Sequence, residues 1–171
     1  MATIAQGNSV DYFVPVPNAP QRPPSLIALP SYLASYVAAY GRASLEAELT
    51  GRGLQLTHNA VLFALSDFGP LAQQQLSDCL RIDKSHLVRY IDKLEADGLL
   101  RRDADPHDRR RHRVVLTENG RRTAATLKVA ATASQQNLLG ALNATEQAQL
   151  IDLLTRVLAA NDADQEPAAA G

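Results

Sequence analysis

About midway along the chain, two short segments with helical spacing of apolar residues directly precede two short β-prone segments. The first helix is expected over Leu71–Leu80, and the second begins at Asp83 as its N-cap and ends at Gly98. The β-prone segments, Leu99–Asp103 and His112–Leu116, flank a turn rich in Asp, Pro and Arg, so they predict a hairpin with a basic loop. Few folds accommodate this order of elements.

The second of these helices has two different faces. Its apolar residues Leu87, Ile91 and Leu94 fall on one stripe, which predicts a core-facing side. The other side is mostly polar and basic, and it carries Lys84, Ser85, His86, Arg89 and Lys93. An α-helix fits the major groove of DNA, and a basic hairpin reaches the adjacent minor groove. The sequence therefore predicts a winged helix-turn-helix, within a mainly α fold that has a small β-hairpin wing.

The distribution of charge supports a local polyanion site. The 171 residues have a formal net charge of −1, so bulk charge does not draw the protein to nucleic acid. Residues 81–122 alone have a net charge of +4, and the remainder of the chain has −5. The alternative interpretation is a charged face that only contacts solvent.

The helices on either side predict a second structural region. Apolar residues at helical spacing run from Ser31 to near Gly51, and Thr57 is the expected N-cap of a helix that ends at Gly69-Pro70. Thr117 opens a long helix, and Asn143 begins the last one in a capping-box-like sequence. That last helix carries an apolar stripe of Leu150, Leu153, Leu154, Val157 and Leu158.

Four regions are expected from these boundaries. Residues 1–29 form a Pro-rich arm, and residues 161–171 form a flexible tail. Residues 57–117 form the winged helix-turn-helix. Residues 30–56 and 118–160 form a helical dimerisation region.

Several classes of protein are disfavoured. The sequence contains no GxSxG, HExxH, Walker-type or GxGxxG element, so we expect neither an enzyme nor a cofactor. The four histidines are scattered without metal-ligand spacing, so we expect no metal. The chain has no apolar run that spans a bilayer, and residues 1–6 lack the features of a signal peptide. With a single cysteine, Cys79, this predicts a cytoplasmic protein with no membrane partner.

Three sequence elements, in order, carry a resemblance to a known family. They are LEADGLLRR at 94–102, DPHDRR at 105–110 and VVLTENG at 114–120. They resemble the LExxGLxxR, DPxDRR and VxLTxxG elements of the MarR-type transcriptional regulators, and the resemblance extends over about residues 30–160. It implies a homodimer with interlocking N- and C-terminal helices and one winged domain per subunit.

The resemblance also assigns DNA-contacting residues. Ser85, His86 and Arg89 match groove-facing positions of the recognition helix, Arg110 matches the wing-tip arginine, and Asp108 matches the carboxylate that organises that tip. Arg89 can donate two hydrogen bonds to guanine, and His86 can donate to a purine N7. The base-reading set is thus His86, Arg89 and Lys84. The backbone set is Ser85, Lys93, Arg111 and Arg113, and the wing set for the minor groove is Arg110, Arg109 and Asp108.

The expected function is a sequence-specific regulator, a repressor, that binds a near-palindromic operator in double-stranded DNA as a homodimer. In the resembled family, small aromatic acids and phenols bind between the dimerisation helices and the winged domain. Here we expect Tyr36, Tyr40, His58 and Phe63 to line that pocket, with the alternative that the tyrosines are dimer core and His58 is exposed. Two further alternatives are a winged-helix dimer that binds a ligand or a protein without reading DNA, and a redox-responsive regulator acting through Cys79.

Overall fold

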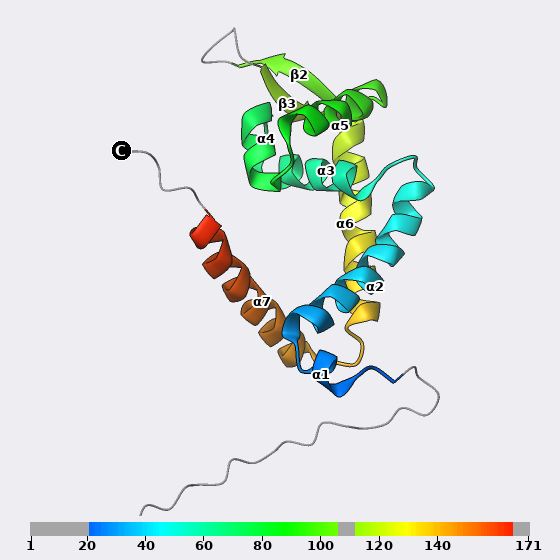
Figure 1. The fold of residues 1–171 in the computed structure, drawn as a ribbon. Coiled ribbons are helices and arrows are strands. Elements are labelled where there is room, and N and C mark those ends of the chain that lie inside the picture. The colour runs from blue at the N-terminus through cyan, green and yellow to red at the C-terminus, as the bar shows by residue number, and fades with distance from the viewer. Residues whose placement is uncertain (1–20, 106–111, 166–171) are drawn as a thin grey trace, which may run out of the picture. The chain divides into compact units, whose positions relative to one another are not determined.

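The computed structural model describes residues 21–105 and 112–165 (Figure 1). The chain divides into two compact units, residues 1–35 and 36–171. The first contains the short helix α1 (Pro24–Ile27) and the start of α2 (Pro30–Thr50), so part of the expected Pro-rich arm is helical. The second contains the rest of α2 and all the other elements. No helix of the described residues is long and apolar enough to cross a membrane.

Helix α3 (Leu56–Phe68) begins two residues earlier than predicted, because its N-cap is Gln55 and not Thr57. The backbone N–H of Gln55 donates to Nδ1 of His58 at 2.9 Å, and Gln55 is the N-cap residue. His58 thus takes the place that Glu or Gln occupies in the usual capping box. The helix ends as predicted at Gly69, whose φ of 80° suits glycine, before Pro70.

The expected helix over Leu71–Leu80 is divided into two elements. Leu71–Ala72 forms a short strand, β1, and helix α4 spans Gln73–Leu80. Strand β1 pairs antiparallel with β3 (His112–Leu116), with Leu71 opposite Val114. Pairing with a strand more than forty residues away in the sequence therefore decides the conformation here, and local helical spacing does not.

Helix α5 (Lys84–Ala96) has the two ends that the sequence predicts. Asp83 caps its start, because the Asp83 carboxylate accepts the N–H of Ser85 at 2.8 Å. Gly98 adopts a φ of 69° after its end, and the N–H of Leu99 donates to the carbonyl of Leu94 at 2.9 Å. This is the hydrogen bond of a Schellman motif, which favours glycine at the position of Gly98.

The wing is an antiparallel hairpin of β2 (Leu100–Ala104) and β3, in a sheet of order β1-β3-β2. Leu100 lies opposite Leu116 and Ala104 lies opposite His112. The described residues are mainly α-helical with a small β-hairpin wing, which confirms the predicted fold class.

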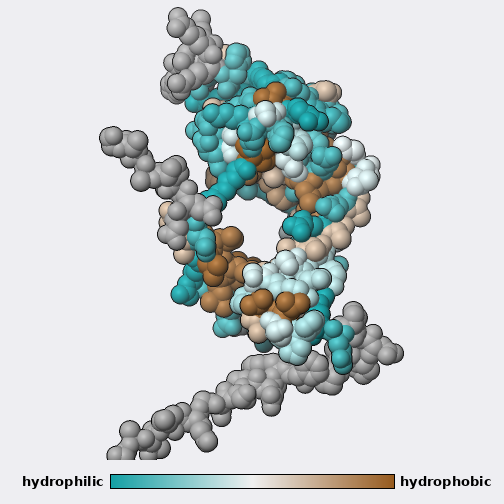
Figure 2. All heavy atoms as spheres, in the orientation of Figure 1, coloured by the Kyte–Doolittle hydropathy of each residue, from teal (hydrophilic) through white to brown (hydrophobic). Residues whose placement is uncertain are grey.

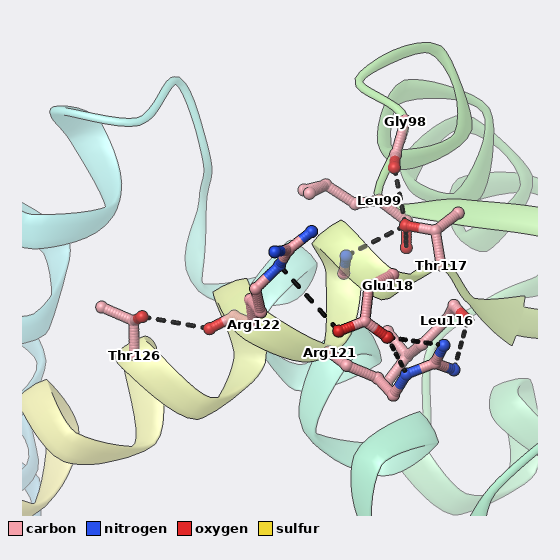
Figure 3. A network of polar contacts seen from close by, with 9 residues as sticks. Gly98, Leu99, Leu116, Thr117, Glu118, Arg121, Arg122 and Thr126 are labelled. Carbon is pink, nitrogen blue, oxygen red and sulfur yellow. Dashed lines mark hydrogen bonds and ion pairs between the residues drawn. The ribbon is translucent and has the colours of Figure 1, made fainter.

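Helix α6 (Glu118–Leu138) is attached to the hairpin at its first turn (Figure 3). The Thr117 hydroxyl accepts the N–H of Gly120 at 3.0 Å and donates to the carbonyl of Gly98 at 2.7 Å. A Cβ at Gly120 would lie 2.0 Å from the carbonyl oxygen of Leu99, so only glycine fits. The Thr and Gly of VVLTENG therefore have structural roles.

Helix α7 (Ala144–Gln165) has the predicted capping box, in which Asn143 and Glu146 each accept the backbone N–H of the other. It continues beyond Asn161, where the flexible tail was expected to begin. None of its described residues is buried, and Figure 2 shows apolar side chains gathered over it. Of the predicted apolar stripe, Leu153, Leu154, Val157 and Leu158 are exposed, as is Ile151, whereas Leu150 is half-buried.

The hydrophobic core belongs to the winged domain and to the helices beside it. Its fully buried members include Leu62 of α3, Leu76 of α4, Ile91 of α5 and Leu127 of α6. These side chains hold α5 against the other helices on one side. The opposite side of α5 carries exposed residues, among them Lys84, Ser85 and Arg89.

Candidate nucleic-acid interface

Helix α5 presents the basic face that the sequence predicts. Leu87, Ile91 and Leu94 are fully buried. The residues expected to contact DNA from this helix are all exposed: Lys84, Ser85, His86, Arg89 and Lys93. The burial of the apolar stripe therefore fixes which side chains point outward.

The exposed cations of α5 differ in their partners. Lys93 pairs at 2.6 Å with Asp97, the C-cap residue of the helix. Within the described part of the chain, Lys84 and Arg89 form no ion pair. Both can therefore approach an anion without first losing a carboxylate partner.

Ser85 already uses its hydroxyl within the helix cap. The hydroxyl donates to Asp83, whose carboxylate also accepts the N–H of Ser85. The Ser85 hydroxyl and N–H together lower the pKa of Asp83, so this cap stays ionised at neutral pH. To donate to a DNA phosphate, the Ser85 hydroxyl must first leave Asp83.

The hairpin places further guanidinium groups after the recognition helix. Arg113 of β3 donates through Nε to Asp105 at 2.5 Å, and Arg101 of β2 pairs with Asp103 at 2.8 Å. The four predicted residues nearest the wing tip, Asp108, Arg109, Arg110 and Arg111, lie outside the described residues. The structure therefore positions the base of the wing, where Arg113 is half-buried.

His58, in the first turn of α3, is buried against α5. Its side chain is 6% exposed, and its ring meets the ring of Tyr90 edge-on at 5.2 Å. Burial lowers the pKa of His58, and the nearby charge of Lys93 lowers it further. His58 is therefore neutral at pH 7, whereas the sequence suggested a partner for an anion.

The other three predicted pocket residues differ in exposure. Tyr36 and Tyr40 lie on α2 and are 41% and 58% exposed. Phe63 of α3 is half-buried beside the core, and the Lys128 ammonium lies 5.7 Å from the centre of its ring. His58 therefore contacts Tyr90, and Phe63 contacts Lys128.

A groove of about 760 Å³ lies between α2 and α6, and none of the four predicted pocket residues lines it. Its walls carry small and polar side chains, namely Ser44, Ala47, Glu48, Gly51, Arg52, Ala130, Ala133, Ser134 and Asn137. Ser134 is buried, and its hydroxyl has no hydrogen-bond partner among the described residues. Sequence reasoning missed this groove because small residues at helical spacing give no apolar stripe.

Sequence reasoning also missed two arginines near the recognition helix. Arg81, between α4 and α5, adopts a left-handed conformation with φ 51°, which is uncommon for a residue with a side chain. Arg102 of β2 contacts two acidic residues of α5. Only the LExxGLxxR element pointed to Arg102, because it places an acid, Glu95, seven residues before that arginine.

Other chemistry is sparse in the described ranges. Cys79 is exposed, and desolvation raises the pKa of its thiol, with the carboxylate of Asp78 adding to the effect. A protonated thiol is a weak nucleophile. Across residues 21–105 and 112–165, no group of three His, Cys, Asp or Glu side chains is arranged to hold a metal ion.

The chain is similar to known proteins in sequence and in structure. The MarR family profile matches residues 52–111. A curated protein of Thauera aromatica, described as a transcriptional regulatory protein for the hcr operon, is 33% identical over 87 residues. That match spans 51% of this chain and about half, 52%, of the relative.

Two solved structures cover more of the chain. A MarR-family transcriptional regulator from Silicibacter pomeroyi is 30% identical, with a TM-score of 0.68, over 78% of this chain and 90% of that one. CouR from Rhodococcus jostii RHA1, solved with p-coumaroyl-CoA bound, is 26% identical, with a TM-score of 0.70, over 79% and 95%. The Thauera and Silicibacter relatives are described as transcriptional regulators, in agreement with the prediction that the chain is not an enzyme. These similarities and the winged domain together show that the chain belongs to the MarR family of transcriptional regulators.

Proposed function

We propose that this protein is a repressor that binds a near-palindromic operator as a homodimer. The observation that carries the proposal is the outer face of α5. It holds Lys84 and Arg89 without an ion pair among the described residues, on a helix fixed by the Asp83 cap and by three buried apolar side chains. A helix held in this way can place its exposed side chains on base edges in the major groove.

Within this proposal the side chains have separate tasks. Arg89, His86 and Lys84 read bases, and Ser85, Lys93, Arg111 and Arg113 contact the phosphate backbone. Arg110 and Arg109 enter the minor groove, with Asp108 organising the wing tip. The exposed apolar stripe of α7 supports assembly, because a stripe of this size packs against another surface in most proteins.

The proposal is tested by selecting bound duplexes from fragments of genomic DNA. Two recognition helices related by a two-fold axis read half-sites about one helical turn, or 10 base pairs, apart. We expect the selected duplexes to share an inverted repeat with that spacing. Recovery of fragments without a common inverted repeat would contradict the proposal and favour a winged-helix dimer that binds a ligand or protein.

We also propose that a small aromatic ligand relieves DNA binding. CouR is bound to a thioester of an aromatic acid, and Tyr36, Tyr40 and Phe63 offer rings of the kind that such a ligand packs against. His58 contributes as a neutral ring, because it is buried. The ligand acts by binding the DNA-incompetent arrangement of the two recognition helices more tightly than the competent one.

Screening aromatic carboxylates and phenols for release of a selected duplex tests this second step. Release by a compound is expected to weaken in Tyr36→Ala, which removes an exposed ring. If release is unchanged in Tyr36→Ala and in His58→Ala, the ligand binds elsewhere. Release by thiol oxidation, lost in Cys79→Ser, would instead support the redox alternative, which the raised pKa of Cys79 disfavours.

A further inference from the structure

Arg102 is a charged residue on the face of β2 that points toward α5. Side chains alternate along a strand, so Arg102 shares its face with the buried Leu100, two residues before it. Its neighbour Arg101 lies on the other face and is exposed. The Arg102 side chain is 28% exposed, so its charge needs partners close by.

Both partners lie on the recognition helix. The Arg102 guanidinium pairs with Asp92 at 2.5 Å and with Glu95 through a second nitrogen. The backbone N–H of Arg102 also donates to the Glu95 carboxylate at 3.0 Å. Three contacts therefore join one residue of the hairpin to two residues of α5, and two separate guanidinium nitrogens define a direction as well as an attraction.

Asp92 lies on the side of α5 proposed to face DNA. It follows Arg89 by three residues and Ser85 by seven, so the three side chains project from one side of the helix. An unpaired carboxylate there would repel phosphates. Arg102 both neutralises this carboxylate and connects the recognition helix to the hairpin.

We propose that Arg102, held by Asp92 and Glu95, is a positioning residue that sets the hairpin β2–β3 against the recognition helix, so that both elements contact one DNA site together. This inference rests on the proposed function. Arg102 itself contacts no base. Through the position of the hairpin, it affects the preference for the base pairs that flank those read by α5.

The chain offers a matched control in Arg101. Arg101 has the same charge, is adjacent in the same strand, and pairs with Asp103 inside that strand. The side chains of both Arg101 and Asp103 are more than 40% exposed. Arg101→Met therefore removes one positive charge and one ion pair from the hairpin and leaves the contact with α5 in place.

The experiment uses a duplex selected by the wild-type protein and the same duplex with its flanking A·T pairs replaced by G·C. The ratio of the two affinities measures flank preference. We expect Arg102→Met to reduce this ratio by about twofold to thirtyfold, the range by which a residue connecting two sites modulates their coupling. Arg101→Met is expected to keep the wild-type ratio, although both variants bind more weakly as a result of the lost charge.

Asp92→Asn gives a second, independent test if Arg102→Met does not fold. Asp92 is exposed, and the Asn variant keeps the contact of Arg102 with Glu95. We expect Asp92→Asn to bind both duplexes more tightly, because a negative charge near phosphate is lost, and yet to show a smaller flank preference. A role in stability alone predicts no change in that ratio for a folded variant.

Other outcomes overturn the inference. Equal loss of flank preference in Arg101→Met and Arg102→Met would mean that charge, not position, matters. An unchanged ratio in Arg102→Met and Asp92→Asn, or a wild-type protein without flank preference, would overturn it as well. A wild-type protein that selects no duplex at all would contradict the proposed function instead.

Discussion

Arg89 lies in the middle of the exposed face of α5 and has no ion pair among the described residues. We expect Arg89→Ala to weaken binding of a selected duplex by about 1–3 kcal/mol and to relax preference at one base pair, because a bidentate contact with guanine is lost. Lys93→Ala is the comparison, since Lys93 is assigned to the backbone and already pairs with Asp97. Lys93→Ala is expected to weaken binding by the same factor for duplexes of every sequence. Titrations with duplexes altered one base pair at a time distinguish the two, and sequence-blind losses in both would show that Arg89 does not read bases.

His58 is expected to make the stability of the winged domain depend on pH. Its folded pKa is lowered below the ordinary value of about 6.5, so the unfolded chain binds a proton more readily than the folded protein. Stability from this group is therefore complete above about pH 6.5 and decreases as the pH falls toward the folded pKa. Urea unfolding at pH 7.5 and 5.5 measures the decrease.

Two variants assign that pH dependence to a residue. His58→Ala is expected to be less stable at both pH values, because the Gln55 N–H loses its acceptor, and to show a smaller decrease between them. His86→Ala, which removes an exposed histidine, is expected to keep the wild-type decrease. A decrease that persists in full in His58→Ala would place its origin in another group.

The junction between hairpin and α6 determines how the winged domain is attached to the rest of the chain. At this junction Gly120 approaches the Leu99 carbonyl so closely that a Cβ would lie 2.0 Å from it. We expect Gly120→Ala to reduce the free energy of unfolding by about 2–4 kcal/mol, because backbone must move. At Gly51, a Cβ would lie 3.7 Å from its nearest neighbour, so Gly51→Ala is expected to change stability by less than about 1 kcal/mol. Equal effects in thermal unfolding would contradict this account of the junction.

Elements whose ends depend on local chemistry were predicted from the sequence. Asp83 and Gly98 delimit α5 because an N-cap carboxylate and a left-handed glycine act on their own neighbours. Strand β1 was not predicted, because two residues form a strand only through pairing with β3. The N-cap of α3 lies two residues before the predicted Thr57, since a histidine replaces the usual capping acid.

The same distinction applies to the candidate site. The exposed face of α5 follows from the position of its apolar stripe, so the sequence was sufficient to predict it. The partners of Arg102 depend on the register of the hairpin and on how it packs against α5, which no local pattern specifies. Burial of His58 against Tyr90 likewise depends on packing between two helices.

At the scale of the whole molecule, most of the apolar stripe of α7 is exposed in a single chain, and none of its residues belongs to the hydrophobic core. Leu154 is 45% exposed and Val157 is 61% exposed. We expect the wild-type protein to be a dimer at micromolar concentration and Leu154→Asp to be a monomer, as measured by analytical ultracentrifugation. Ala159→Asp adds the same charge on the opposite side of α7 and is expected to remain dimeric.

Loss of the dimer is expected to weaken operator binding as well. Two linked half-sites gain about 10²–10⁴-fold from effective concentration, and a monomer loses that gain. If Leu154→Asp stays dimeric, the subunit interface does not include this side of α7. If it becomes monomeric and binds DNA as tightly as the wild type, then pairing of half-sites is not part of recognition.

The central claim is that α5 reads DNA sequence, and a competition measurement tests it most directly. The affinity of the protein for a selected inverted-repeat duplex is compared with its affinity for a scrambled duplex of the same composition, at 50 mM and 200 mM salt. We expect the selected duplex to bind at least about 10³-fold more tightly, as for typical specific regulators, and both affinities to fall as salt rises. Equal affinity for the two duplexes at both salt concentrations would contradict the claim.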